Sequence, residues 1–291
     1  MATADSDASL RLDGHNQQRR ILALQRIAGY LSVAPLAGPG AVVLPPPSAR
    51  DIYQFGVLLG FGLRAWVDAM PRLNLSLASS SVWGFDSFSG MPSEQDGFMR
   101  DVHKRDKSWQ PGGLNTAHLL RTSDWNVMQQ RLIQNIGFGV DRTHLVRGFY
   151  NESLVGGAAL RDKQGMQPAF LLDIDCDLYS SSKQALRFML ETGLLVPGSF
   201  VYYDDYSVEQ WKVPASRHPH KEERLAHEEI TQEFQLQWRP LFHHRYQGPV
   251  PGLEWIRQWP ANNTKVMNRV LSGNNLNPVL QLLSCGRCPK T

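Results

Sequence analysis

The chain has 291 residues, of which 42% are hydrophobic and 20% are charged. This composition is ordinary for a globular protein with a buried core. The formal net charge is only +3 and no run of Lys or Arg stands out, so a nucleic-acid partner is not indicated. The sequence also has no stretch of about 18 apolar residues, the length that would indicate a membrane span.

The first 50 residues predict an extension before the main domain. Residues 1–15 are polar and small, which favours disorder, and they resemble neither a secretory signal nor a transit peptide, so a cytoplasmic location is expected. Apolar residues recur at helical spacing over 17–31 and predict a helix that packs on its own domain, in preference to a membrane surface or a partner. The same helix is available to pair protomers in a homo-oligomer. Residues 35–47 are rich in Pro, Gly and Ala and predict a linker, so the extension covers 16–50.

From residue 51 onward, short apolar runs alternate with helical patterns. The first run, 51–57, predicts a strand or a helix leading into one. The other expected strands are 81–85, 144–147, 170–174 and 199–203, and the expected helices are 64–70, 126–135, 182–190 and 221–234. This alternation predicts an α/β fold with a doubly wound, mostly parallel sheet.

The rest of the chain fits into the same domain. Residues 238–259 are expected to finish the sheet as an antiparallel pair. We find no second domain boundary, so 51–291 is expected to form one domain, with the polar stretch 91–125 as an inserted lid.

Two features near the expected strand ends suit a bound ligand. Glycines at 56, 60 and 62 follow the first strand, where they would let the backbone approach a ligand closely, although helix packing uses the same spacing. Asp86 ends the second strand, a position from which a carboxylate commonly holds a ribose diol. Alone, Asp86 is better explained by an ordinary Asx turn after the strand.

A cluster of carboxylates gives the strongest chemical signal. Asp173, Asp175 and Asp177 alternate at the end of one buried run, and Asp204 and Asp205 end the next. If the first strand continued, its period of two would place the first three on one side. Like charges cannot gather in ionised form without a cation, a hydrogen-bond network or raised pKa values. The pattern predicts an all-oxygen site for Mg²⁺ or Mn²⁺, while helix capping beside a solvated acidic rim is the structural alternative.

At these residues the sequence resembles the macrocin O-methyltransferase-like family of class I S-adenosylmethionine-dependent enzymes, which methylate sugar hydroxyls. The resemblance spans about residues 51–210 and is carried by FGVLLGFG, VWGFDSFSGMP, VRGFYNESL, DIDCDLYSSS and GSFVYYDDYS. It implies a Rossmann-like seven-stranded sheet that binds S-adenosylmethionine at its carboxyl edge. It also implies a small-molecule acceptor with a hydroxyl group, a sugar or another natural product.

The resemblance implies roles for individual residues as well. Gly56 and Gly60 would line the methionine and ribose side of the cofactor, Asp86 would hold the ribose, and Ser87 would lie near the adenine. The implied metal ligands are Asp175, Asp204 and Asp205. Asp177 would be the catalytic base, because Leu178 stands where other members carry a histidine.

Two positions depart from the family pattern. Gln54 stands where the family usually has an acidic residue; its amide can still hydrogen-bond the cofactor but does not counter a positive charge. Asp173 is an extra carboxylate inside the strand and is expected to be paired or protonated.

Two other readings of the chain stay open. Asp175-Cys-Asp177 also fits the Asp-x-Asp motif of a metal-dependent nucleotide-sugar glycosyltransferase, which would leave Asp86 and Asp204-Asp205 without a role. A non-catalytic binding protein with the methyltransferase fold is the third hypothesis, supported by the change at Gln54.

Cysteine and histidine residues outside these motifs have structural readings. Three cysteines are too few for a disulfide framework and fit a reducing compartment, and Cys285 and Cys288 are expected to be free thiols in a frayed tail rather than a zinc or redox pair. The histidines at 218, 220, 227, 243 and 244 lie in charged surroundings that predict a solvated helix and loop.

Overall fold

A computed structural model describes residues 4–33, 44–46, 49–95, 98–99, 104–206, 222–241 and 279–289. In this part of the chain, seven strands form one sheet in the order β3-β2-β1-β4-β5-β7-β6. The strands are β1 (Asp51–Phe55), β2 (Val82–Asp86), β3 (Thr143–Arg147), β4 (Ala169–Ile174), β5 (Phe200–Tyr203), β6 (Leu236–Pro240) and β7 (Val279–Cys285). The first five are parallel, and β7 is antiparallel to both β5 and β6. The predicted doubly wound α/β fold is confirmed.

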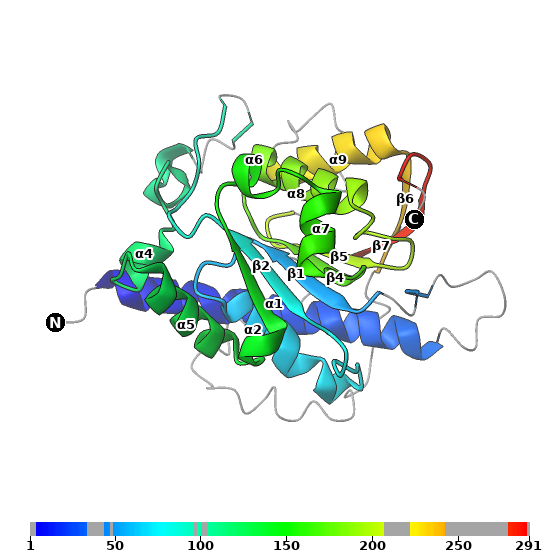
Figure 1. Cartoon of the computed structure of the whole chain (residues 1–291), viewed down its shortest axis with the longest axis horizontal. Coiled ribbons are helices and arrows are strands. Elements are labelled where there is room, and N and C mark those ends of the chain that lie inside the picture. The colour runs from blue at the N-terminus through cyan, green and yellow to red at the C-terminus, as the bar shows by residue number, and fades with distance from the viewer. Residues whose placement is uncertain are drawn as a thin grey trace.

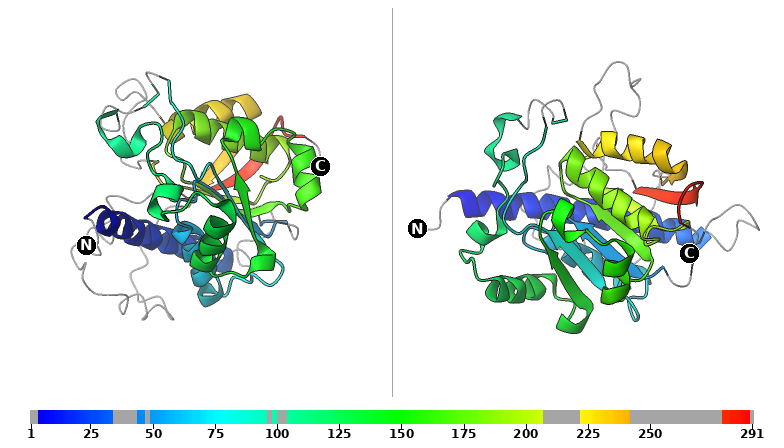
Figure 2. Two further views of the ribbon diagram at one scale, coloured as in Figure 1. Left: turned by 60° about the vertical axis from the view of Figure 1, so that its left-hand side comes forward. Right: turned by 45° about the horizontal axis from the view of Figure 1, so that its top comes forward.

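Helices cover both faces of the sheet (Figure 1). One face carries α1 (Ala4–Val33), α2 (Phe61–Ala69) and α5 (Trp125–Ile136), and the other carries α8 (Tyr179–Glu191) and α9 (Glu222–Phe234). The remaining short helices are α4 (Thr116–Leu119), α6 (Tyr150–Ser153) and α7 (Ala158–Gln164), with 3₁₀ turns η2 (Pro71–Leu73), η3 (Lys107–Trp109) and η4 (Val140–Arg142). Figure 2 shows α1 as one long helix running along its face of the sheet.

The two faces of the sheet bury separate apolar clusters. Leu172 and Ile174 of β4 pack toward α8 and α9, whereas Leu171 of the same strand packs toward α1, α2 and α5. Strands covered on both faces are apolar almost throughout. A polar residue inside such a strand therefore needs a partner from the covering helices, and Asp173 is the residue to which this applies in β4.

The N-terminal helix differs from its predicted extent. Residues 1–15 were expected to be disordered, but α1 begins at Ala4. Alanine and acidic residues in the first turn favour the start of a helix. The prediction of disorder considered only the polar composition of the segment and overlooked this preference. The prediction that the 17–31 helix packs on its own domain is confirmed, because Leu24 and Ile27 are fully buried against α2 and the sheet.

The C-terminal strand pair also differs from the prediction. An antiparallel pair finishes the sheet, but β6 pairs with β7, which starts at Val279, beyond the predicted stretch. Residues 242–259 of that stretch lie outside the described residues. Cys285 ends β7 and forms a disulfide with Cys288, so the expectation of free thiols is wrong. In the described ranges no helix is long and apolar enough to span a membrane.

Candidate functional site

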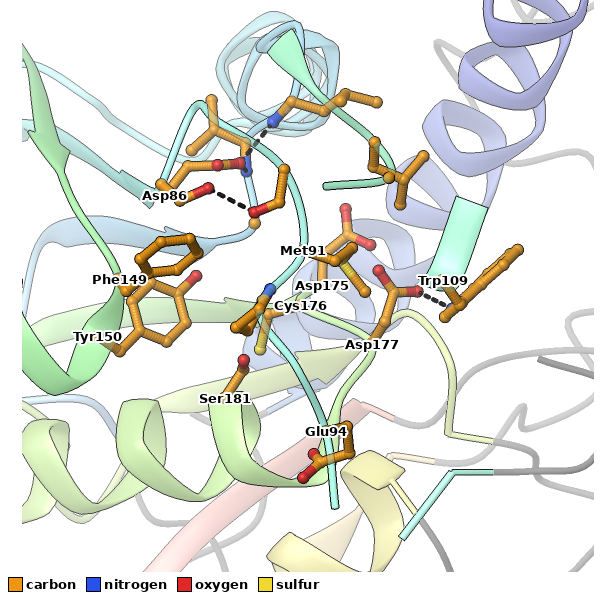
Figure 3. A pocket seen from close by; sticks show the side chains of 18 of the residues that line it. Asp86, Met91, Glu94, Trp109, Phe149, Tyr150, Asp175, Cys176, Asp177 and Ser181 are labelled. Carbon is orange, nitrogen blue, oxygen red and sulfur yellow. Dashed lines mark hydrogen bonds between the residues drawn. The ribbon is translucent and has the colours of Figure 1, made fainter. Parts of the chain in front are cut away.

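A cavity of about 1350 Å³ opens at the carboxyl edge of the parallel strands. Parallel α/β sheets bind ligands at this edge because the loops after the strands converge there. The cavity is lined by residues that follow β1, β2, β4 and β5, and by several residues of the 91–125 segment. Figure 3 shows the labelled residues of this cavity, with Asp86 near one end and Asp175 and Asp177 toward the other.

The turn after β1 brings the backbone of two strands into contact. Gly56 has φ = 89°, and a side chain at this position would lie 1.8 Å from the carbonyl oxygen of Asp175. Only glycine fits so close an approach. Gly56 lines the cavity, whereas Gly60 starts α2 and faces Ile136 of α5. Their contacts with a cofactor stay predictions. The glycine spacing therefore combines one position at the site with one that serves helix packing.

Asp86 organises the same turn. Its carboxylate accepts backbone N–H bonds from Val57 (2.8 Å), Leu58 (3.0 Å) and Phe88 (2.7 Å). Burial nevertheless raises the pKa of Asp86 above its ordinary value, against the lowering effect of these hydrogen bonds. Asp86 and Ser87 both line the cavity, as expected for residues beside a ribose and an adenine. The Asx-turn reading is also correct, because the carboxylate caps the turn at Phe88.

Gln54 points its amide at the acidic end of the cavity. The side chain is 1% exposed, its Nε2 donates to Asp175 Oδ2 at 3.2 Å, and its Oε1 has no hydrogen-bond partner among the described residues. A buried acceptor without a partner is costly, so a ligand donor at this place would stabilise it. Gly62 leaves room for Gln54, since a side chain there would lie 2.4 Å from Nε2.

The carboxylates after β4 do not continue the strand alternation. β4 ends at Ile174, and Asp177 has φ = 61°, so the predicted placement of Asp173, Asp175 and Asp177 on one strand face is wrong. Asp173 points between α1 and α2, where Trp66 Nε1 donates to its Oδ2 at 2.8 Å. Asp175 and Asp177 lie in the loop and line the cavity with Asp204 and Asp205.

Arg20 of α1 is the positive partner of this cluster and was not foreseen. Its Nε donates to Asp173 Oδ2 at 2.7 Å, and its Nη2 donates to Asp173 Oδ1 at 3.3 Å and to Asp175 Oδ2 at 2.5 Å. Its Nη1 lies 3.5 Å from Asp204 Oδ1. Burial lowers the pKa of Arg20, but the three carboxylates outweigh burial and leave the pKa above its ordinary value. The expectation that Asp173 is paired is confirmed.

Asp177 sits at the outer part of the cluster in a strained conformation. Left-handed backbone is uncommon for aspartate and costs on the order of 1 kcal/mol or more, a strain often found at functional sites. Trp109 Nε1 of η3 donates to Asp177 Oδ1 at 3.1 Å (Figure 3). Burial and the neighbouring Asp205 carboxylate, which hydrogen-bonds Asp177, raise the pKa of Asp177 well above its ordinary value.

Glu223 of α9 is a further acid that sequence reasoning missed. It is 1% exposed and its Oε2 accepts the backbone N–H of Asp205 at 3.1 Å. Burial, followed by the charges of Asp205 and Asp175, raises the pKa of Glu223 well above its ordinary value. It was read as one charge of a solvated helix, and only the packing of α9 against the sheet shows that it faces inward.

The predicted metal ligands do not surround a common point in this arrangement. Within the described ranges, no group of three or more His, Cys, Asp or Glu side chains has the spacing to hold a metal ion. Asp175 and Asp204 each direct an oxygen to Arg20, whose guanidinium lies between them. These carboxylates, as arranged, fit a guanidinium rather than a divalent ion. The positive charge of the guanidinium would repel a divalent ion bound beside it.

The 91–125 segment, predicted as a lid, contacts the loop after β4 and the start of α8. Glu94 Oε2 accepts the backbone N–H of Ser180 at 2.7 Å, a favourable place for a carboxylate at a helix N-terminus. Phe98 stacks on Tyr179 with ring centroids 4.2 Å apart. Together with the bond from Trp109 to Asp177, these contacts join the segment to the acidic end of the cavity.

His227 is the described member of the predicted solvated histidines. It is buried in α9, where its ring contacts Tyr206 and Trp238 and its Nδ1 hydrogen-bonds Tyr203 Oη at 2.9 Å, so the solvated reading is wrong for this residue. Trp109 does line the cavity, whereas Trp125 packs on Phe88. The other histidines of that group lie outside the described residues.

Comparisons with known proteins place this geometry in a family. The family model described as Macrocin-O-methyltransferase (TylF) matches residues 61–238, more than half of the chain. Curated proteins give no significant match. Among solved structures, the calicheamicin methyltransferase CalS11 is 18% identical and has a TM-score of 0.43, over 78% of this chain and 76% of its own. The O-methyltransferase NovP is 16% identical with a TM-score of 0.45, over 78% and 74% of the two chains.

The family match carries the assignment by itself, and the observed sheet order agrees with the fold that the resemblance implies. The matched residues include β2, Asp86 and both acidic strand ends. We conclude that this chain belongs to the macrocin O-methyltransferase (TylF) family and is an O-methyltransferase.

Proposed function

We propose that the enzyme transfers the methyl group of S-adenosylmethionine to a hydroxyl of a small molecule with vicinal oxygens, a sugar or another natural product. The observation that carries the proposal is that the Gly56 turn, Asp86 and the carboxylates that follow β4 and β5 all line one cavity in a chain of this family. A ligand in this cavity would contact both the glycine turn and the acidic end.

The cofactor would lie along the turn after β1. Gly56 lets the backbone approach it, and Oε1 of Gln54 offers an acceptor for its amino group. Asp86 uses its oxygens on backbone N–H groups, but a carboxylate has about four acceptor positions and can still take a ribose hydroxyl. The excess of carboxylates at the acidic end suits a cofactor that carries a positive sulfonium.

The chemistry needs a base near the acceptor hydroxyl. The methyl carbon leaves sulfur and bonds the hydroxyl oxygen in an in-line displacement, and the hydroxyl proton must go to a protein group. Asp177 would take this proton in its ionised form, since its carboxylate lines the cavity at the acidic end. Trp109, bonded to Oδ1, would fix the direction of the carboxylate.

The predicted dependence on Mg²⁺ or Mn²⁺ stays a prediction. The carboxylates that would hold the ion are present, but two of them are bonded to Arg20. We therefore derive no step of the reaction through a metal.

Cofactor binding tests the proposed function directly. We expect S-adenosylhomocysteine to raise the melting temperature of the protein, because it fills the cavity beside Gly56 and Gln54, and we expect UDP to have no effect. The shift is measured with each ligand in the presence and absence of Mg²⁺. Stabilisation by UDP alone would identify a glycosyltransferase and contradict the proposal.

The base assignment is tested by Asp177→Asn. The amide keeps the shape but cannot accept the proton, so turnover of methyl from labelled S-adenosylmethionine onto a panel of vicinal diols should fall by about 10²-fold or more. Binding of S-adenosylhomocysteine should be retained, which shows that the variant is folded. A variant that keeps the wild-type rate would remove Asp177 from this role. Tight cofactor binding with no transfer to any diol, even in the wild type, would favour a non-catalytic binding protein.

A further inference from the structure

The side chain of Arg20 reaches the acidic end of the cavity from a helix that sequence reasoning kept apart from the site. It is 1% exposed and bonds Asp173, Asp175 and Asp204, which lie 153, 155 and 184 residues further along the chain. All three nitrogens of the guanidinium point at carboxylate oxygens. Arginine is suited to this task because its fork presents several donors in a fixed plane and stays charged when buried.

Arg20 is held by rigid surroundings rather than by a loop. The next two turns of α1 place Leu24 and Ile27 in the core, fully buried with Trp66. The guanidinium carbon lies 6.0 Å from the ring centre of Trp66 and 5.3 Å from that of Tyr202. The position of the charge is therefore fixed by packing that exists without any ligand.

The bonds of Arg20 compete with a metal for the same oxygens. Asp175 Oδ2 and Asp204 Oδ1 face the guanidinium, and a divalent ion bound to both carboxylates would lie within a few ångströms of a buried positive charge. Like charges at such distances repel each other strongly where water is excluded.

We propose that Arg20 is the resident cation of the acidic edge and takes the place that a divalent metal would otherwise occupy. It is a positioning residue: its guanidinium bonds Asp175 and Asp204 and orients them at the acidic end of the cavity, without touching the methyl group. The proposal rests on the proposed function only in taking the acidic end of the cavity as the place where the acceptor binds. Its test uses metal binding and needs no turnover.

The experiment measures Mn²⁺ binding by electron paramagnetic resonance and by calorimetry, with Mn²⁺ itself as the probe. Arg20→Met should bind Mn²⁺ about tenfold or more tightly than the wild type, because it frees two carboxylates and removes a positive charge. Adding Asp175→Asn to this variant should abolish the gain. Arg20→Lys, which keeps the charge, should not show it.

A matched control lies on the same turn of the helix. Arg19 is partly exposed and 4.0 Å from Asp204, so Arg19→Met removes an equal charge without opening the network. It should change Mn²⁺ affinity by less than about threefold, since exposed charges interact weakly. If Arg19→Met raised the Mn²⁺ affinity as much as Arg20→Met, the change in net charge alone would explain the effect, and the proposal would be contradicted.

A second variant tests the proposal if Arg20→Met does not fold. Arg20→Met leaves Asp173 buried beside Trp66 without a cation, which could prevent folding. The double variant Arg20→Met, Asp173→Asn removes both charges and keeps an acceptor for Trp66. Stabilisation by S-adenosylhomocysteine reports that the cofactor site is intact and tests the proposed function separately. If this double variant is folded and binds Mn²⁺ no better than the wild type, or if the wild type binds Mn²⁺ tightly through Asp204, the proposal is overturned.

Discussion

Packing sets the protonation state of single residues in this protein, and His227 is an example. Burial, followed by the charge of Arg224, lowers the pKa of His227 from 6.5 to about 3. The ring is therefore neutral in the folded protein and hydrogen-bonds Tyr203. In the unfolded chain the same ring takes up a proton near pH 6.5.

This difference predicts how stability changes with acidity. Because the pKa is lower in the folded state, the unfolded state binds the proton first, so the contribution of His227 is complete above pH 6.5 and falls as the pH drops toward 3. Between pH 6.5 and pH 5 the loss should be about 1.6 kcal/mol of unfolding free energy. His227→Gln cannot titrate and should show a smaller decrease, measured by urea denaturation at the two pH values. Equal decreases in the two proteins would contradict the assignment.

The acids at the site show why some residues could be foreseen and others could not. Asp175, Asp177, Asp204 and Asp205 are in motifs that follow apolar runs, so their place at a strand end was predictable. Glu223 and Arg20 lie on helices with ordinary charged faces, and nothing local marks them. Their roles arise from contacts across many residues of sequence, which periodicity in one segment does not report.

At the scale of elements, α1 is part of the core rather than an appendage. Its contacts with α2 and β7 cover the face of the sheet that the other helices leave open. The apolar spacing predicted this face, while the start of the helix and the inward direction of Arg20 were missed. A mixed face with apolar residues and one buried arginine has the same periodicity as a solvated amphipathic helix.

Truncation of one buried side chain in α1 measures this contribution. Leu24 is fully buried, so Leu24→Ala should lower the free energy of unfolding by about 2–4 kcal/mol through lost apolar contact and a residual cavity. Leu44 is 56% exposed, and Leu44→Ala is the matched control with an expected change near zero. Both are measured by urea denaturation at neutral pH. Similar values for the two variants would show that α1 does not stabilise the domain.

At the scale of the molecule, the parallel part of the sheet could be predicted because each βαβ unit has its own sequence pattern. The partner of β6 at the antiparallel end could not, since 38 residues separate β6 from β7 and no local signal sets that pairing. The site follows the same rule. The residues that follow consecutive strands were predicted, and so was the 91–125 segment as a lid. The contributions of Arg20 from the N-terminal helix and of Glu223 from α9 were not predicted.

The bond between Trp109 and Asp177 links the proposed catalytic base to the position of the 91–125 segment. The Asp177 carboxylate accepts a hydrogen bond from the indole and also hydrogen-bonds Asp205. Glu94 and Phe98 fasten the same segment to the start of α8. An acceptor that displaces these contacts as it enters would release the Asp177 carboxylate from Trp109. The acceptor would be fully bound only when the 91–125 segment returned to these contacts. Selection among acceptors would then depend on whether the bound acceptor allows the segment to return, and not only on how well the acceptor fits the cavity.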